Sequence, residues 1–186
     1  MSVIIGLVAQ KLAGKDTVAE YLIQKYGAVS YAGGHILNDI LKVLGQEVSR
    51  DNETKLAVNL RQAFGEEVLN SAILNRLQGA QAELKLINGI RRPKEFTQAQ
   101  QAGVRTVYIY ASPEVRFARY KNRQEKIDDG ILSFDEFVQQ DEQSPTEKDI
   151  ITVGEQAEFR LENNGELVDL YAQVDKLIKQ LLRIEE

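Results

Sequence analysis

A glycine and a lysine follow closely on the first apolar run of the chain, in the stretch 9–17 (Ala-Gln-Lys-Leu-Ala-Gly-Lys-Asp-Thr). Loops that bind phosphate place Gly-Lys and then Ser or Thr between a buried strand and a helix, so that backbone N–H groups converge on phosphate oxygens. Gly14 and Lys15 stand in those positions, while Ala9 replaces the first glycine and Asp16 takes the place of the hydroxyl residue. The stretch predicts a nucleotide phosphate site.

Each side chain of this loop has an expected role. Lys15 is expected to reach the β- and γ-phosphates and to be the catalytic lysine. Asp16 is expected on the magnesium side, directly or through water, because a carboxylate beside phosphates is otherwise repelled. The alternative for Asp16 is an ordinary acidic residue in a first helical turn. Ala13, Gly14 and Thr17 complete the nucleotide contacts expected within the loop.

Arginines follow in the segments that would flank a nucleotide cleft. Phosphoryl transfer needs positioning and charge neutralisation more than covalent help, and the arginine fork matches phosphate oxygens bidentately. Arg91 is the most telling, because it comes just after a strand, where open α/β sheets bind ligands. Any one of the others is equally compatible with a solvated surface charge. The full set is Arg50, Arg61, Arg91, Arg92, Arg116, Arg119 and Arg123.

The kind of acceptor can be inferred from the lack of a carboxylate at one strand end. A hydroxyl acceptor usually needs a carboxylate base to take its proton. The strand end at Asn88 and Gly89 offers no carboxylate, whereas a phosphate acceptor is already ionised and needs none. The sequence therefore favours a monophosphate substrate, with Asp16 and Asp39 as candidate bases if the acceptor is a hydroxyl.

The elements that must position these residues alternate between strand and helix. Val3 to Val8 is a β-branched apolar run without alternation, as in a strand buried on both faces of a parallel sheet. The chain order predicts a three-layer α/β fold with a mostly parallel sheet. The remaining expected strands are 28–31, 83–88, 104–111 and 159–162, and the expected helices are 15–26, 35–78 with a break at Gly65, one from Pro93, 113–123, a short one opened by Ser133-x-x-Glu136, and 167–184.

The tetrad Gly14-Lys15-Asp16-Thr17 resembles that of the P-loop nucleoside and deoxynucleoside monophosphate kinases, a group similar in layout to adenylate kinase. It is also similar to that of dephospho-CoA-kinase-like proteins, many of which read Gly-Lys-Asp-Thr-Val-Ala here. Asn88-Gly89-Ile90-Arg91 resembles an Asp-Gly-x-Arg element of the same families. Residues 60–65 with Arg50 are similar to their substrate-side helices, and residues 157–165 to their last strand and base-side loop.

This resemblance implies a P-loop NTPase fold with a five-stranded sheet, and ATP with Mg²⁺ as the donor. It implies an acceptor-binding lobe near 32–80 and a lid near 124–150 within one domain of residues 1–186. Arg50, Arg61 and Arg91 would bind the substrate, and Asn163 would join the nucleotide contacts.

Three positions depart from the family pattern. Ala9 adds a methyl group where the backbone turns most tightly, which is tolerable if its φ stays negative. Asn88 replaces a carboxylate near the expected magnesium shell. The lid stretch 136–141 has glutamines where the relatives tend to place an arginine that stabilises the transferring phosphoryl group. Arg119 and Arg123, with Arg116, are the expected substitutes for that charge.

The amino-acid composition excludes several classes of protein. The chain has 186 residues, no cysteine and one histidine, which excludes a disulfide scaffold and thiolate chemistry and makes His35 a poor metal ligand. A net charge of −5 argues against binding to nucleic acid, and no stretch is long and apolar enough to span a membrane. We expect a cytoplasmic monomer or homodimer acting on small-molecule nucleotides.

Three functions remain open at this stage. The first is transfer of the γ-phosphoryl group of ATP to a nucleoside or deoxynucleoside monophosphate. The second is dephospho-CoA kinase activity, in which the acceptor is a ribose hydroxyl. The third is nucleotide binding without catalysis, favoured by Ala9, Asn88 and the glutamine-rich lid stretch.

Overall fold

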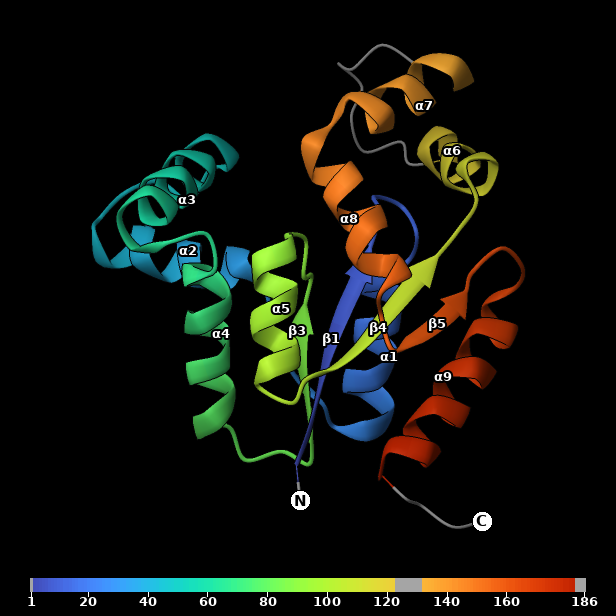
Figure 1. The fold of residues 1–186 in the computed structure, drawn as a ribbon, viewed down its shortest axis with the longest axis horizontal. Helices are drawn as coiled ribbons and strands as arrows, with labels where there is room; N and C mark the ends of the chain where they lie inside the picture. The colour runs from blue at the N-terminus through green and yellow to red at the C-terminus, as the bar shows by residue number, and fades with distance from the viewer. Residues whose placement is uncertain (1, 123–131, 183–186) are drawn as a thin grey trace.

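The computed structural model describes residues 2–122 and 132–182, which form one parallel sheet between layers of helices (Figure 1). The strands of this five-stranded sheet lie in the order β2-β3-β1-β4-β5, and every pair is parallel. They are β1 (Val3–Ala9), β2 (Val29–Tyr31), β3 (Leu84–Asn88), β4 (Arg105–Tyr110) and β5 (Phe159–Glu162). The predicted three-layer α/β fold is thereby confirmed, with a sheet that is parallel throughout.

The helices divide between the two faces of the sheet. They are α1 (Lys15–Tyr26), α2 (Gly33–Val43), α3 (Arg50–Phe64), α4 (Val68–Gly79), α5 (Pro93–Gln101), α6 (Pro113–Asn122), α7 (Phe134–Gln143), α8 (Pro145–Glu155) and α9 (Leu167–Leu182). Helices α1 and α9 cover one face, and α4, α5 and α8 cover the other (Figure 1). None of the helices within the described ranges is long and apolar enough to cross a membrane.

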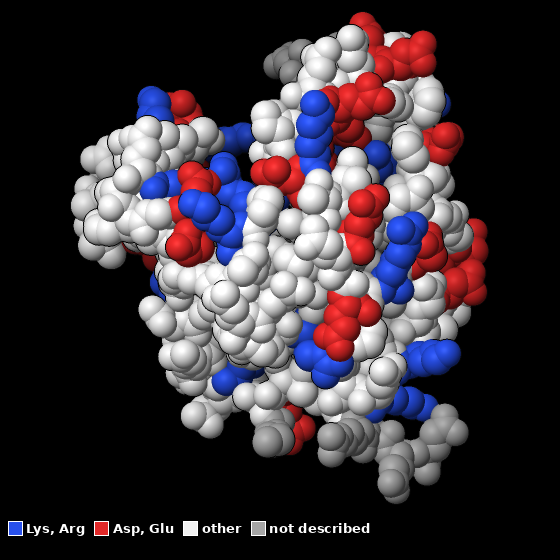
Figure 2. Space-filling model, in the orientation of Figure 1, with Lys and Arg blue, Asp and Glu red and all other residues white. Residues whose placement is uncertain are grey.

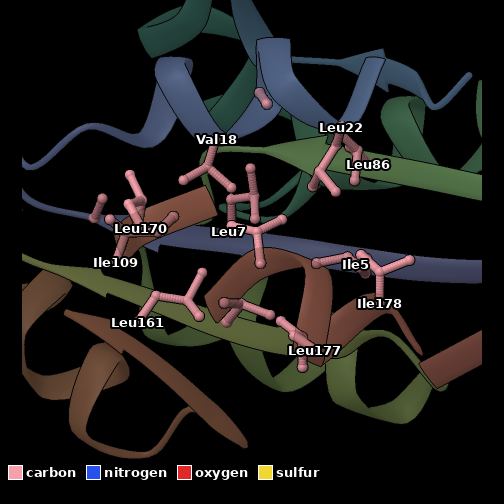
Figure 3. Packing of buried hydrophobic residues seen from close by; sticks show 14 of the residues in the cluster. Ile5, Leu7, Val18, Leu22, Leu86, Ile109, Leu161, Leu170, Leu177 and Ile178 are labelled. Carbon is pink, nitrogen blue, oxygen red and sulfur yellow. The ribbon is translucent and has the colours of Figure 1, made fainter. Parts of the chain in front are cut away.

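Strand β1 lies at the centre of the sheet, and its consecutive residues pack into the two hydrophobic cores on opposite faces of the sheet. Leu7 packs with Val18 of α1 and Leu170 of α9 in one hydrophobic cluster (Figure 3). Val8 packs into the other cluster, which α4, α5 and α8 cover. This double burial explains why β1 is apolar without alternation, as expected for a central parallel strand. It also fixes the carboxyl end of β1, where the phosphate loop begins.

Local signals set several boundaries as predicted. Helix α3 ends at Gly65, whose φ of +101° interrupts the long helical pattern before α4. Ser133 and Glu136 form the expected capping box of α7, each side chain pairing with the other residue's backbone N–H. Helix α8 was not predicted separately. Its signal was nevertheless present, because Ser144 caps the helix and Pro145 stands at its first position.

Two inserts depart from the regular strand–helix alternation. Helices α2, α3 and α4 lie between β2 and β3, within the predicted acceptor lobe 32–80. Helix α7 and the start of α8 lie within the predicted lid 124–150, of which residues 124–131 fall outside the described ranges. The roles of lobe and lid stay predictions.

Candidate functional site

The predicted phosphate loop joins the end of β1 to the start of α1. Among the described non-glycine residues, only Leu12 has a positive φ, +64°, so Ala9 keeps the negative φ that its methyl group requires. Gly14, at φ +100°, precedes α1 and gives it no side-chain cap. A Cβ on Gly14 would lie 2.2 Å from Nδ2 of Asn163, so only glycine fits there. The uncapped start of α1 leaves backbone N–H groups for an anion.

Lys15 lies between the first turn of α1 and the end of β3. Its Nζ is 2.5 Å from Oδ1 of Asp16 and 2.6 Å from Oδ1 of Asn88. Asn88 also donates from Nδ2 to the same Asp16 oxygen, at 3.3 Å. The amide of Asn88 thus occupies the strand-end position beside the lysine and the carboxylate, as the resemblance implied.

Asn163 follows β5 and Arg119 lies in α6, so both contact the loop from the β5 side of the sheet, whereas Asn88 contacts Lys15 from the β3 side. Asn163 donates from Nδ2 to the carbonyl oxygen of Ala13 at 2.8 Å. Arg119 donates from Nη1 to the carbonyl of Leu12 at 3.0 Å and from Nη2 to that of Asn163 at 2.8 Å. Burial lowers the pKa of the Arg119 guanidinium. In this arrangement Arg119 braces the backbone of the loop, and its expected catalytic role stays a prediction.

Thr17 and Arg123 are the other residues expected to contact nucleotide or phosphate. Thr17 is half-buried in the first turn of α1. Arg123, expected to act with Arg119, lies outside the described residues.

Helices α7 and α8 contact the loop through a network of charges that sequence reasoning missed. Asp141 of α7 is buried between Nη1 of Arg116 and Nζ of Lys11, the latter at 2.9 Å. Lys11 and Arg116 also face the ring of Phe137, at 4.7 and 5.6 Å from its centroid. Glu147 of α8 accepts from the backbone N–H of Lys11 at 3.4 Å. The spacing of residues along the chain does not indicate these contacts, because Lys11, Arg116 and the residues of α7 and α8 come from three separate segments of the sequence.

The carboxyl group of Glu147 has a raised pKa. Its burial, and then the nearby charge of Asp141, raise its pKa from the ordinary 4.5. A carboxyl whose pKa is higher in the folded chain destabilises the fold once it ionises. This cost is absent in acid, where the folded and unfolded chains are both protonated.

Glu147→Gln should therefore raise the free energy of unfolding at neutral pH, and this advantage should shrink as the pH falls from the raised pKa of the folded chain toward 4.5 and be lost below 4.5. Denaturant unfolding at a series of pH values measures it. Glu136→Gln is the opposite-sign control, because hydrogen bonds from Ser133 lower the pKa of Glu136. That variant should lose stability at neutral pH and approach the wild type in acid. Equal pH profiles for Glu147→Gln and the wild type would contradict the assignment.

A cleft of about 740 Å³ opens beside the loop, between the α2–α4 insert and the ends of β3 and α8. All three residues predicted to bind substrate lie on its wall. Figure 2 shows Lys and Arg side chains gathered, with a few acidic ones, where this insert meets the body. The polar lining includes Arg50, Glu53, Arg61, Asn70, Asn88, Arg91, Arg92, Glu95 and Thr146.

Glu95, a residue that sequence reasoning missed, organises the floor of the cleft. It is buried, and its carboxylate accepts from the backbone N–H of Arg91 at 3.1 Å and lies 3.5 Å from Nη2 of Arg61. The Nε atom of Arg61 is buried without a hydrogen-bond partner. In the sequence, Glu95 is recognisable only as an acidic residue in the first helical turn after Pro93. Such a residue is equally typical of any helix N-terminus. Arg61 therefore presents an unused donor at the cleft.

Gly89 is where the predicted donor and acceptor groups meet. A Cβ at this glycine, whose φ is +114°, would lie 3.7 Å from Cε of Lys15 and 3.9 Å from Nε of Arg91. The side chains of the loop lysine and the cleft arginine thus both lie close to one backbone position that has no side chain. Asp39, the other candidate base, is instead paired with Arg76 at 2.6 Å.

The fold and this loop define the class of the protein. A five-stranded parallel sheet in the order 2-3-1-4-5, with the loop between β1 and α1, is the fold of P-loop kinases. Residues 5–142 match the AAA domain family AAA_18, and the chain belongs to that family.

Three known proteins illustrate the likeness. The chain is 25% identical over 183 residues to a UPF0200 protein of Methanothermobacter thermautotrophicus, with 96% of this chain and 90% of that protein covered. The crystal structure of TT1252 from Thermus thermophilus superposes with a TM-score of 0.61 at 20% identity, covering 97% and 98% of the two chains. Shikimate kinase from Bacteroides thetaiotaomicron gives a TM-score of 0.57 at 17% identity, covering 98% and 99%. At these identities the two solved structures show the shared fold alone.

Proposed function

We propose that this protein is a phosphotransferase that moves the γ-phosphoryl group of ATP to the phosphate of a nucleoside or deoxynucleoside monophosphate. The observation that carries the proposal is the meeting of Lys15 and Arg91 at Gly89. It puts a phosphate-loop cation and a cleft cation next to one position that has no side chain. Donor and acceptor phosphates can therefore approach each other there.

The donor side fits a nucleotide with a divalent cation. Magnesium is usually held by one or two carboxylates together with substrate phosphates, and Asp16 beside Asn88 supplies one carboxylate and one amide oxygen. When bound, ATP with Mg²⁺ supplies the phosphoryl group and neutralises part of its charge. Lys15 holds the β- and γ-phosphates against the start of α1, and Asn163 and Arg119 keep the loop in shape from behind.

The acceptor side fits an anion. Among the described residues that line the cleft, the arginines are Arg50, Arg61, Arg91 and Arg92, and the carboxylates are Glu53 and Glu95. Arginine forks bind phosphate oxygens bidentately, and an ionised phosphate needs no base.

Arg91→Ala should weaken the binding of the monophosphate by roughly 1.5–3 kcal/mol, the range for a hydrogen bond to a charged group, while ATP affinity changes far less. Arg91→Lys should restore only part of the loss, because an ammonium keeps the charge but not the fork. Calorimetric titration of both ligands into each variant measures the effect. Lys94→Ala, an exposed cation on α5, serves as the control with unchanged affinities. If ATP affinity fell as much as monophosphate affinity, Arg92 or Arg61 would be the better candidate.

A hydroxyl acceptor is the second candidate, and one observation favours it. Glu53 and Glu95 line the cleft, so the structure offers carboxylates that Asn88 does not. The protein of similar fold from Bacteroides thetaiotaomicron is, by its name, a kinase of shikimate. Dephospho-CoA is the hydroxyl substrate to try, and formation of CoA would promote this alternative.

Coupled ADP-release assays across the common nucleoside and deoxynucleoside monophosphates test the proposal. We expect turnover with at least one of them. ATP binding without transfer to any acceptor would instead identify a non-catalytic nucleotide-binding protein.

A further inference from the structure

The phosphate loop carries a second lysine, Lys11, which the mechanism above does not use. Its Nζ lies 2.9 Å from Oδ1 of Asp141, and its side chain is 37% exposed, against 6% for that of Asp141. The other cation on Asp141 is Arg116, whose side chain is 3% exposed. Lys11 is thus the outer member of a three-charge row that runs from the mouth of the loop into the protein.

Lys11 is also the member that can leave. If its ammonium moves away, Asp141 keeps the guanidinium of Arg116 as counter-ion, so no buried charge is left alone. Arg116 keeps its own bond to the carbonyl of Ala111 as well. Oδ1 of Asp141 has no hydrogen-bond partner, so moving Lys11 away breaks an ion contact but no hydrogen bond.

The site has a place for such a cation. Between residues 132 and 155 the only basic residue is Lys148, which lines a second cavity together with Arg116 and Asp141. Arg119 is engaged with the carbonyls of Leu12 and Asn163. Lys15 is on the β3 side of the loop, beside Asn88. On the α7–α8 side, Arg116 is buried and paired with Asp141, so Lys11 is the partly exposed cation that the loop itself carries there.

We propose that Lys11 is a second phosphate-binding cation of the loop, held on Asp141 in the nucleotide-free protein and transferred to the γ-phosphate when a triphosphate binds. The proposal rests on the proposed function, since it assumes that the loop binds ATP. It assigns to Lys11 the recognition of a triphosphate over a diphosphate, because a diphosphate has no γ-phosphate for Lys11 to contact. The contact neutralises charge on the group being transferred.

Dissociation constants of Mg·ADP and of the Mg complex of the β,γ-imido analogue of ATP, measured by calorimetry on the full chain, test this assignment. Lys11→Met should weaken the analogue about tenfold, near the low end for hydrogen bonds between charged groups, and leave ADP nearly unchanged. Lys11→Arg should retain most of the preference for the analogue. Lys148→Met, which removes a nearby cation on α8, should change neither affinity. The melting temperature of Lys11→Met should stay near that of the wild type, because Arg116 still pairs with Asp141.

The possible outcomes separate this assignment from the proposed function. Equal weakening of ADP and analogue would mean that Lys11 only shapes the loop, and unchanged affinities would mean that it does not touch the nucleotide. Either result overturns the assignment of Lys11 while the phosphotransferase proposal stands. A wild-type chain that binds neither nucleotide would overturn both.

Discussion

Lys15→Ala should remove nucleotide binding, and any phosphoryl transfer should fall by at least about a hundredfold, the loss typical when one preorganised charge-stabilising donor is deleted. The ammonium is at the start of α1 between Asp16 and Asn88, in the position from which it can reach the β- and γ-phosphates. The fold should survive, because this side chain is at the edge of the cleft and not in either hydrophobic core.

Nucleotide titration, single-turnover kinetics and thermal unfolding together test this expectation. Lys25→Ala is the matched control, since Lys25 is an exposed lysine in the last turn of the same helix. That variant should bind nucleotide as the wild type does. If Lys15→Ala kept its ATP affinity and rate, the phosphate-loop interpretation would fail altogether.

Asp141→Ala should lower the free energy of unfolding by roughly 3–5 kcal/mol, the cost of leaving a buried charge without its partner. The guanidinium of Arg116 is almost fully buried beneath α7, and the carboxylate of Asp141 is its counter-ion. The guanidinium of Arg116 also faces the ring of Phe137 on the same helix as Asp141, so the loss should loosen α7 as a whole.

Urea unfolding measures the change. Glu142→Ala is the control, because it removes an exposed acid from the adjacent position of α7 and should stay within about 0.5 kcal/mol of the wild type. The double variant Asp141→Leu with Arg116→Met should recover much of the loss, since apolar residues of similar size can replace a buried ion pair. A stable Asp141→Ala, or no recovery in the double variant, would show that the pair does not hold α7.

The sequence predicted the fold well because the decisive signals are local. A strand buried on both faces must be apolar at every position, so β1 is recognisable from Val3 to Val8 alone. Gly27 and Gly65 adopt positive φ at the ends of helices, which glycine favours. Helix α8 was missed because Ser144 ends α7 and begins α8 at once, so no loop separated the two.

The site was only partly predictable. A short sequence motif identifies Gly14 and Lys15, and the end of a predicted strand identifies Asn88. The structure brings these residues together. The partners Glu95 and Asp141 carry no such signal, because their roles depend on packing between distant segments. Asp141 meets Arg116 across 25 positions of the chain. From the sequence alone, two charged residues so far apart are expected at the surface, because charged residues are rarely buried. Only the fold brings these two together and excludes water from them.

Transfer of a labelled γ-phosphate from ATP is the most direct test of the proposed function. Purified full-length protein would be incubated with γ-labelled ATP, Mg²⁺ and each nucleoside or deoxynucleoside monophosphate in turn, and the products separated by chromatography. We predict label in the diphosphate of at least one acceptor, none with Lys15→Ala, and a higher KM for that acceptor with Arg91→Ala. Label found only in ATP and free phosphate, with every monophosphate tried and with ATP shown to bind, would contradict the proposed function.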